Sequence, residues 1–145
     1  IAEAAALRCS AEGASVFVVS RTPDNARALA ERVNAAEGQA GWAAANLTQE
    51  AETDAAVSAA FDRFGRIDGL FSVAGGSGRG FGDGPIHELT MDGWDRTLEL
   101  NLRSQALIAR AVTRVMLAQV PTGVGSRSGP SSGRSGPSPG RAGPR

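Results

Sequence analysis

The feature that most constrains this chain is the regular alternation of short apolar runs with longer helical segments. Residues 14–20 (ASVFVVS) are apolar on both faces and too short for a helix, which predicts a buried parallel strand. Residues 39–45 and 67–74 are predicted to form two further strands. Helices are predicted at 1–12, from Pro23 to Gly38, from Thr48 to Gly65 and from Thr90 to about Gln119. Strands that alternate with helices predict a doubly wound α/β sheet.

The length and the composition predict one domain followed by a tail. The sequence has 145 residues, which is room for a single domain. From residue 121 onward almost every residue is proline, glycine, serine or arginine, and such a segment has nothing to bury. We therefore predict a folded domain over residues 1–120 and a disordered tail over residues 121–145.

The charge and hydropathy patterns exclude two classes of protein. All fifteen acidic residues precede Asn101, whereas eleven arginines lie between residue 1 and Arg114, so the body carries a net charge of −4 (11 − 15). A basic nucleic-acid-binding domain is excluded for the body. No run of about eighteen apolar residues occurs, so no membrane span is predicted.

The residue types that are rare or missing exclude several kinds of site. One cysteine and one histidine cannot build a disulfide framework or a Cys/His zinc site, and no metal is predicted. The sequence contains no tyrosine and no lysine, so it offers neither a Walker lysine nor a tyrosine acid. It begins at Ile1 without a signal-peptide pattern, so we interpret residue 1 as a cut end and expect a cytoplasmic location.

Ligands of doubly wound sheets bind at the carboxyl ends of the strands, so the residues that follow each strand are the candidates. The first strand ends in Ser20 and Arg21. In a dinucleotide fold an acid here would hold a ribose 2′-hydroxyl, whereas an arginine accommodates a 2′-phosphate. The plainer alternative is a solvated arginine before a helix. The third strand ends in small residues that let a ring or a ribose approach the backbone.

The glycine-rich loop that follows the third strand does not carry a phosphate-binding motif. No register of residues 75–85 matches G-x-G-x-x-G, and a P-loop is excluded because the chain has no lysine. We interpret these residues as a flexible loop beside the pocket.

Asn101 is the most informative residue of the last helix. Helical periodicity places it on one stripe with Trp94, Leu98 and Ile108, which predicts that it is buried. A buried carboxamide needs hydrogen-bond partners. It either bonds a neighbouring carbonyl and shapes the helix, or it organises polar groups at a site, and the pattern alone favours the first role.

These segments together resemble the short-chain dehydrogenase/reductase family over roughly residues 1–119. Ile1 and Ala2 match the last two positions of the family's T-G-x-x-x-G-I-G turn, with Ala2 at the final glycine. The run from Asn46 to Thr48 resembles D-V-T, and residues 68–75 (DGLFSVAG) are similar to D-x-x-x-N-N-A-G. Residues 94–116 resemble the helix that carries the catalytic asparagine, which corresponds to Asn101.

The resemblance implies an oxidoreductase that transfers hydride between NADP(H), less favourably NAD(H), and a small carbonyl or alcohol substrate. The fold it implies is a partial Rossmann-like, doubly wound parallel sheet of three strands that lacks the first strand and the catalytic half. The parent protein is expected to be a homo-oligomer. Asn101 is the expected catalytic residue, and the expected cofactor-binding residues are Ile1, Ala2, Ser20, Arg21, Asn46, Leu47, Ala74 and Gly75.

Departures from the family pattern support a second hypothesis. The family's Y-x-x-x-K cannot occur in a chain without tyrosine or lysine, so this chain alone is expected to be inactive. The alternative function is that of a catalytically dead fragment, at most a weak nucleotide-binding or partner-binding remnant. The family's strand order also places the strand that precedes Ile1 between residues 16–19 and 70–73. We therefore expect a gap there, or a third strand that slides over to pair with the first.

Overall fold

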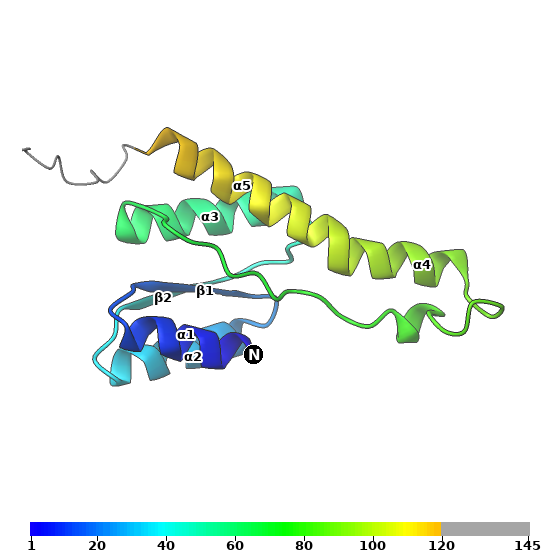
Figure 1. The fold of residues 1–145 in the computed structure, drawn as a ribbon, viewed down its shortest axis with the longest axis horizontal. Coiled ribbons are helices and arrows are strands. Elements are labelled where there is room, and N and C mark those ends of the chain that lie inside the picture. Colours follow the sequence, from blue (N-terminus) through cyan, green and yellow to red (C-terminus); the bar gives the residue numbers. More distant parts are fainter. Residues whose placement is uncertain (120–145) are drawn as a thin grey trace, which may run out of the picture.

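The chain folds into two helical layers around a small parallel sheet, as Figure 1 shows for the computed structural model, which describes residues 1–119. Strand β1 (Val16–Ser20) pairs in parallel with strand β2 (Ala40–Ala44). On one side of this sheet lie helices α1 (Ala2–Ala11) and α2 (Pro23–Ala35). On the other side lie α3 (Glu50–Phe64) and α5 (Ser104–Ala118). The predicted α/β class is confirmed. The tail predicted over residues 121–145 lies outside the described residues.

Local sequence signals explain where the helices begin and end. Pro23 occupies the first turn of α2, where its fixed φ suits the helix and its missing N–H costs nothing. Helix α3 ends at Gly65, whose φ of 73° is left-handed and therefore favours glycine.

Each helical layer has its own apolar cluster. Ala30 and Val33 of α2 pack with Ala40 of β2 on one side of the sheet. On the other side, Val57 of α3 packs with a group from α5 made of Ile108, Ala111 and Val112. All five residues of β1 are only half-buried, although the sequence predicts a fully buried strand. The middle of the molecule is therefore less filled than the two helical layers.

The sheet has two strands where the sequence predicts three. Residues 67–74 follow α3 and run in the same direction as β1, but they form no ladder with it (Figure 1). Within residues 1–119, no backbone hydrogen bond joins this segment to β1 or β2. A strand exists only through its pairing, so an extended segment without a neighbouring strand is not one.

The last helical region is interrupted where the sequence predicts one continuous helix. Helix α4 (Met91–Leu98) leads into the π-helix η2 (Glu99–Arg103), which continues into α5. The prediction of one buried stripe is wrong in its first half, because Trp94 is 47% exposed and Asn101 is exposed as well. The wider π turn rotates the following residues away from the α-helical period. In the described part of the chain, α4 contacts mainly η2, which continues it, and the loop that precedes it. Neither helical layer of the sheet therefore covers the side chains of α4 that were predicted to be buried.

None of the helices among residues 1–119 is both long enough and apolar enough to cross a membrane.

Candidate functional site

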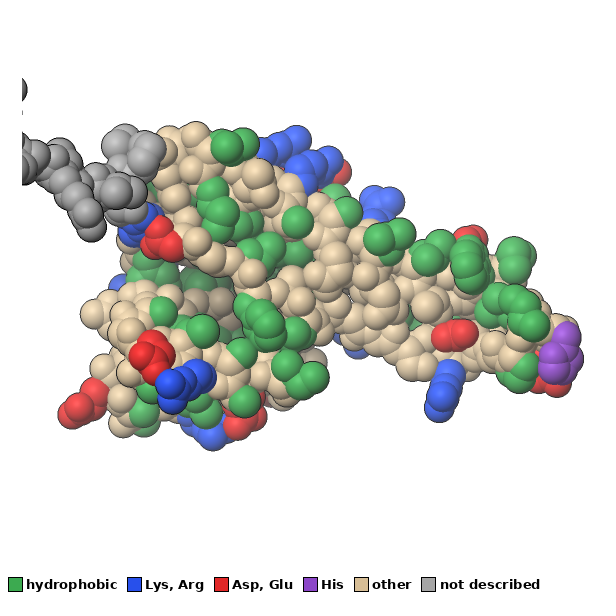
Figure 2. All heavy atoms as spheres, viewed as in Figure 1, with side chains coloured by type: hydrophobic (Ala, Val, Ile, Leu, Met, Phe, Trp, Pro, Cys, Tyr) green, Lys and Arg blue, Asp and Glu red, His purple; other side chains and the backbone are tan. Residues whose placement is uncertain are grey.

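The carboxyl ends of the strands and of the segment 67–74 open onto one cleft of about 1730 Å³. Figure 2 shows this cleft as a hollow between the two helical layers. Ile1 does not line it and is 94% exposed. The other seven predicted cofactor-binding residues all line it: Ala2, Ser20, Arg21, Asn46, Leu47, Ala74 and Gly75.

The end of β1 presents an arginine side chain at the cleft. The hydroxyl of Ser20 accepts a hydrogen bond from the backbone N–H of Thr22 at 3.2 Å, which shapes the turn into α2. Arg21 is exposed, and among residues 1–119 its guanidinium has no ion pair or hydrogen bond. An unpaired guanidinium at a cleft can receive a phosphate in a two-pronged contact.

The polar groups of Asn46, at the end of β2, are used in local hydrogen bonds. The Asn46 carboxamide oxygen accepts from the N–H of Thr48 at 3.2 Å and from its hydroxyl at 3.0 Å. The N–H of Asn46 donates to a carboxylate oxygen of Glu52 at 2.7 Å, which ties the turn to the first part of α3. Leu47 packs against the cluster around Val57. Both predicted residues therefore line the cleft while they hold the start of α3.

Residues 67–76, which follow α3, have no neighbouring strand in the described part of the chain. Three carboxamide side chains hydrogen-bond to this segment instead and hold it. Gln119 donates from Nε2 to the carbonyl of Ile67 at 2.9 Å and accepts from the N–H of the same residue. Gln105 donates to the carbonyl of Ala74. Asn101 forms the third contact, described below. Neither glutamine is among the residues predicted from the sequence. For Gln105 the available signal is its i, i+4 spacing from Asn101 on a helix beside an extended run, whereas this spacing does not include Gln119.

Asn101 forms a two-way pair with the main chain of Gly76. Its Oδ1 accepts from the Gly76 N–H at 3.1 Å, and its Nδ2 donates to the Gly76 carbonyl at 2.7 Å. Nδ2 also donates to the carbonyl of Thr97, four residues earlier, at 2.9 Å. A Cβ on Gly75 would lie only 2.5 Å from Asn101 Oδ1, so this close approach requires glycine. The role of shaping the helix is thus observed, at the π turn itself.

One polar atom in the cleft is left unsatisfied. The hydroxyl of Ser72 is buried and has no hydrogen-bond partner among the described residues. Buried polar atoms are nearly always paired, so an unpaired hydroxyl in a cleft indicates a place where a polar group of a ligand fits.

A surface ion pair marks the start of the same segment. Arg66 donates from Nε to Asp68 at 2.7 Å, with a second contact from its Nη2. These hydrogen bonds hold the pKa of Asp68 below its ordinary value of 3.8. Within residues 1–119, no group of three or more histidine, cysteine and acidic side chains is placed to hold a metal ion.

The glycine-rich loop is packed against α4. It contains the short 3-10 helix η1 (Arg79–Phe81), and the Thr90 hydroxyl donates to the Phe81 carbonyl at 3.1 Å while accepting from the Gly93 N–H at 3.0 Å. A Cβ on Gly93 would lie 2.4 Å from the carbonyl carbon of Gly82, so the loop and the helix touch backbone to backbone. The loop predicted as flexible is therefore bonded at Phe81 and Gly82 to Thr90, the N-cap residue of α4, and at Asp83 to Thr97.

Comparison with known proteins finds one family. A family model described as short chain dehydrogenase matches residues 1–125. Levodione reductase of Leifsonia aquatica is 31% identical over 82% of this chain and 44% of its own length. D-threitol dehydrogenase of Mycolicibacterium smegmatis is 32% identical over 81% of this chain and 44% of its own length. The chain thus spans less than half of these curated relatives.

Solved structures agree with the sequence matches. A putative short-chain dehydrogenase/reductase from Burkholderia xenovorans superposes with a TM-score of 0.72 at 32% identity, over 81% of this chain and 45% of that one. An actinorhodin polyketide ketoreductase variant solved with NADPH gives a TM-score of 0.69 at 27% identity, over 76% and 41%. The described residues therefore have a partial Rossmann-like fold.

Proposed function

Because this chain belongs to the short-chain dehydrogenase/reductase family, we propose that it forms the cofactor-binding part of an oxidoreductase that uses NADP(H). The reaction is hydride transfer between the nicotinamide and a carbonyl or alcohol carbon of a small molecule. The observation that carries the proposal is that seven predicted binding residues line one cleft at the carboxyl ends of the strands.

The side chains of the cleft fit a phosphorylated dinucleotide. Arg21 has no partner among the described residues and offers its guanidinium to a 2′-phosphate. Ala74 and Gly75 present little side chain, so a ring or ribose can approach the backbone. The unpaired hydroxyl of Ser72 offers a donor and an acceptor. The NADPH bound to the actinorhodin ketoreductase supports the choice of NADP(H).

Asn101 has a positioning role in this proposal. Both hydrogens of its Nδ2 are used by the carbonyls of Gly76 and Thr97, and Oδ1 accepts once. One acceptor position of Oδ1 remains, and it can hold a water that belongs to a proton relay.

The names of the relatives support the substrate class. Levodione reductase and D-threitol dehydrogenase are named for a small carbonyl compound and a small alcohol. We propose the same broad class for the parent of this chain, and a cytoplasmic location. The exposed free thiol of Cys9 fits a reducing compartment.

A second candidate function is that of a catalytically dead binding fragment. The observation that favours it is the absence of tyrosine and lysine from all 145 residues. In the family these two residues supply the acid and tune its pKa, so this chain alone has no group to donate the proton.

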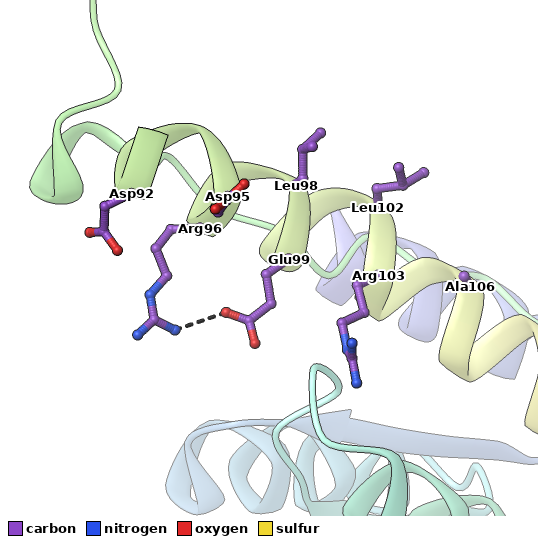
Figure 3. Close-up of a pocket in the computed structure, with 8 residues that line it drawn as sticks. All are labelled: Asp92, Asp95, Arg96, Leu98, Glu99, Leu102, Arg103 and Ala106. Atoms are coloured by element: carbon purple, nitrogen blue, oxygen red, sulfur yellow. Dashed lines mark hydrogen bonds and ion pairs between the residues drawn. The ribbon is translucent and has the colours of Figure 1, made fainter. Parts of the chain in front are cut away.

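The proposed parent self-associates through the outer face of α4 and α5. Leu98, Leu102 and Met91 are exposed on this face, and Figure 3 shows Leu98 and Leu102 projecting away from the Arg96–Glu99 ion pair. Arg103 lies on the opposite side of the helix from these leucines and donates from Nε to the carbonyl of Thr48 at 3.3 Å. Two copies packed through this face would cover its exposed apolar side chains.

Cofactor binding to the whole chain tests the proposed function. Titration calorimetry should give tighter binding of NADPH than of NADH, by about tenfold or more, because an arginine–phosphate contact contributes roughly 1.5–3 kcal/mol. Arg21→Ala should remove the difference, whereas Arg114→Ala, at an exposed position of α5, should leave it unchanged. Equal binding of the two cofactors by the unsubstituted chain would contradict the proposal.

A further inference from the structure

The π-helix η2 is held in its wide turn by side chains. Its backbone hydrogen bonds run from residue i to i−5, whereas those of an α-helix run to i−4. Two carbonyls of this region also accept from side chains four residues later. The Ser104 hydroxyl donates to the carbonyl of Leu100 at 2.6 Å, and Asn101 Nδ2 donates to that of Thr97 at 2.9 Å. Ser104 is 2% exposed, so water does not compete for its hydrogen bond, and the turn has a fixed geometry.

Two residues of this turn reach two different walls of the cleft. Asn101 is bonded to both main-chain groups of Gly76, as described above. Arg103 donates from Nε to the carbonyl of Thr48 at 3.3 Å, and Figure 3 shows it projecting towards the turn that precedes α3. Residues two positions apart on a helix do not share a face, so this spacing suits contacts on two sides. The segment around Gly76 and the turn of residues 46–49 are thus fastened to the same short helix.

The contact of Arg103 reaches a residue of the cleft through a chain of hydrogen bonds. Thr48 is buried, and it donates from its N–H and from its hydroxyl to Asn46 Oδ1. Asn46 in turn lines the cleft. A separate contact attaches α3 itself, because Arg110 of α5 forms an ion pair with Glu50. Removal of the Arg103 donor therefore leaves α3 attached to α5 and releases only the carbonyl within the turn.

We propose that η2 couples the two walls of the cleft, with Arg103 as a positioning residue for the turn of residues 46–49. A change at one wall reaches the other, because Asn101 and Arg103 belong to one rigid turn. The role of this coupling in cofactor binding rests on the proposed function, in which both walls contact the dinucleotide. Walls that are held in place before binding lose less freedom on binding, so they bind the cofactor more tightly. Arg103 acts through Thr48 and Asn46 and does not itself contact the ligand.

Amide hydrogen exchange of the whole chain without cofactor, followed by NMR, tests the coupling. Arg103→Met removes the donor and keeps most of the aliphatic stem. It should speed exchange by about threefold or more at Thr48, whose N–H is bonded within the turn, and at Gly76, whose N–H is bonded to Asn101. Arg103→Lys keeps a donor for this single contact and should restore both rates to within about twofold. Arg114→Met, at an exposed position of α5, is the matched control and should change neither rate.

The reciprocal substitution separates coupling from a merely local role of Arg103. Asn101→Ala should speed exchange at Thr48 as well as at Gly76, because coupling acts in both directions. In the double variant with Arg103→Met, the effect at each amide should be smaller than the product of the two separate effects, since either substitution already uncouples the walls. Unchanged slow exchange at Val33, in the opposite helical layer, shows that the variants fold and have not lost stability as a whole.

Calorimetric titration with NADPH measures the effect of the coupling on the cofactor site. Arg103→Met should weaken binding by about threefold to tenfold, and Arg103→Lys should restore it. If the unsubstituted chain binds no NADPH, the proposed function fails, whereas the exchange experiment still decides the coupling.

Two results would overturn the proposal. Unchanged exchange at Gly76 in Arg103→Met, or at Thr48 in Asn101→Ala, would show that the two walls are not coupled. Equal NADPH binding by Arg103→Met and the unsubstituted chain would show that Arg103 does not position the cofactor site.

Discussion

Replacing Gly75 by alanine should break the contact that holds the 67–76 segment to the π turn. The new Cβ would lie 2.5 Å from Asn101 Oδ1, so the carboxamide must move away. That movement costs its two hydrogen bonds to Gly76, at 3.1 and 2.7 Å. At about 0.5–1.5 kcal/mol each, their loss lowers the free energy of unfolding by roughly 1–3 kcal/mol. The change from glycine to alanine by itself raises the free energy of unfolding by about 0.4–1 kcal/mol, because it reduces the conformational entropy of the unfolded chain.

The assay is urea unfolding followed by far-ultraviolet circular dichroism, together with the exchange rate of the Gly76 amide. Gly69→Ala is the matched control, because a Cβ there meets no atom within 4 Å. In the double variant with Asn101→Ala, the clash is absent, so the two substitutions should destabilise by less than the sum of their separate effects. Stability equal to that of Gly69→Ala, with unchanged Gly76 exchange, would refute the reasoning.

Three further predictions follow from the site. Because Arg66 lowers the pKa of Asp68, this contact stabilises the fold above pH 3.8 and is lost as the pH falls through the lowered pKa. An NMR titration should show the Asp68 pKa below 3.8 and its rise towards that value in Arg66→Ala. Leu98→Glu should shift any dimer to monomer in sedimentation, because it puts a charge in the exposed apolar stripe. The chain alone should reduce no carbonyl substrate with NADPH, which absorbance at the nicotinamide band measures directly.

Segment types and their order could be predicted from the sequence because each has a local cause. The β-branched run that forms β1 excludes a helix by its length, and Pro23 and Gly65 mark helix ends through their backbone preferences. Strand pairing is not local. Residues 67–74 have strand composition, yet they make no ladder because no described strand lies beside them.

The site could be predicted only in part for the same physical reason. The carboxyl ends of parallel strands meet at one edge, so Arg21 and Gly75 were expected to lie at one cleft, and they do. Asn101 was expected to be buried, and it is exposed, because among residues 1–119 no helical layer covers this part of the helix, which helical periodicity alone cannot predict. The clamp by Gln119 links residues 52 positions apart, and such a contact depends on how α5 packs.

The most direct test of the central claim, that the carboxyl ends of the strands form a cofactor site, is an NMR titration of the whole chain with NADPH. The account predicts that the backbone resonances of Ser20, Arg21, Ala74 and Gly75 shift together with a single dissociation constant, while those of Leu98 and Leu102 on the outer face stay unchanged. Shifts confined to the outer face, or no shifts at saturating NADPH, would contradict it.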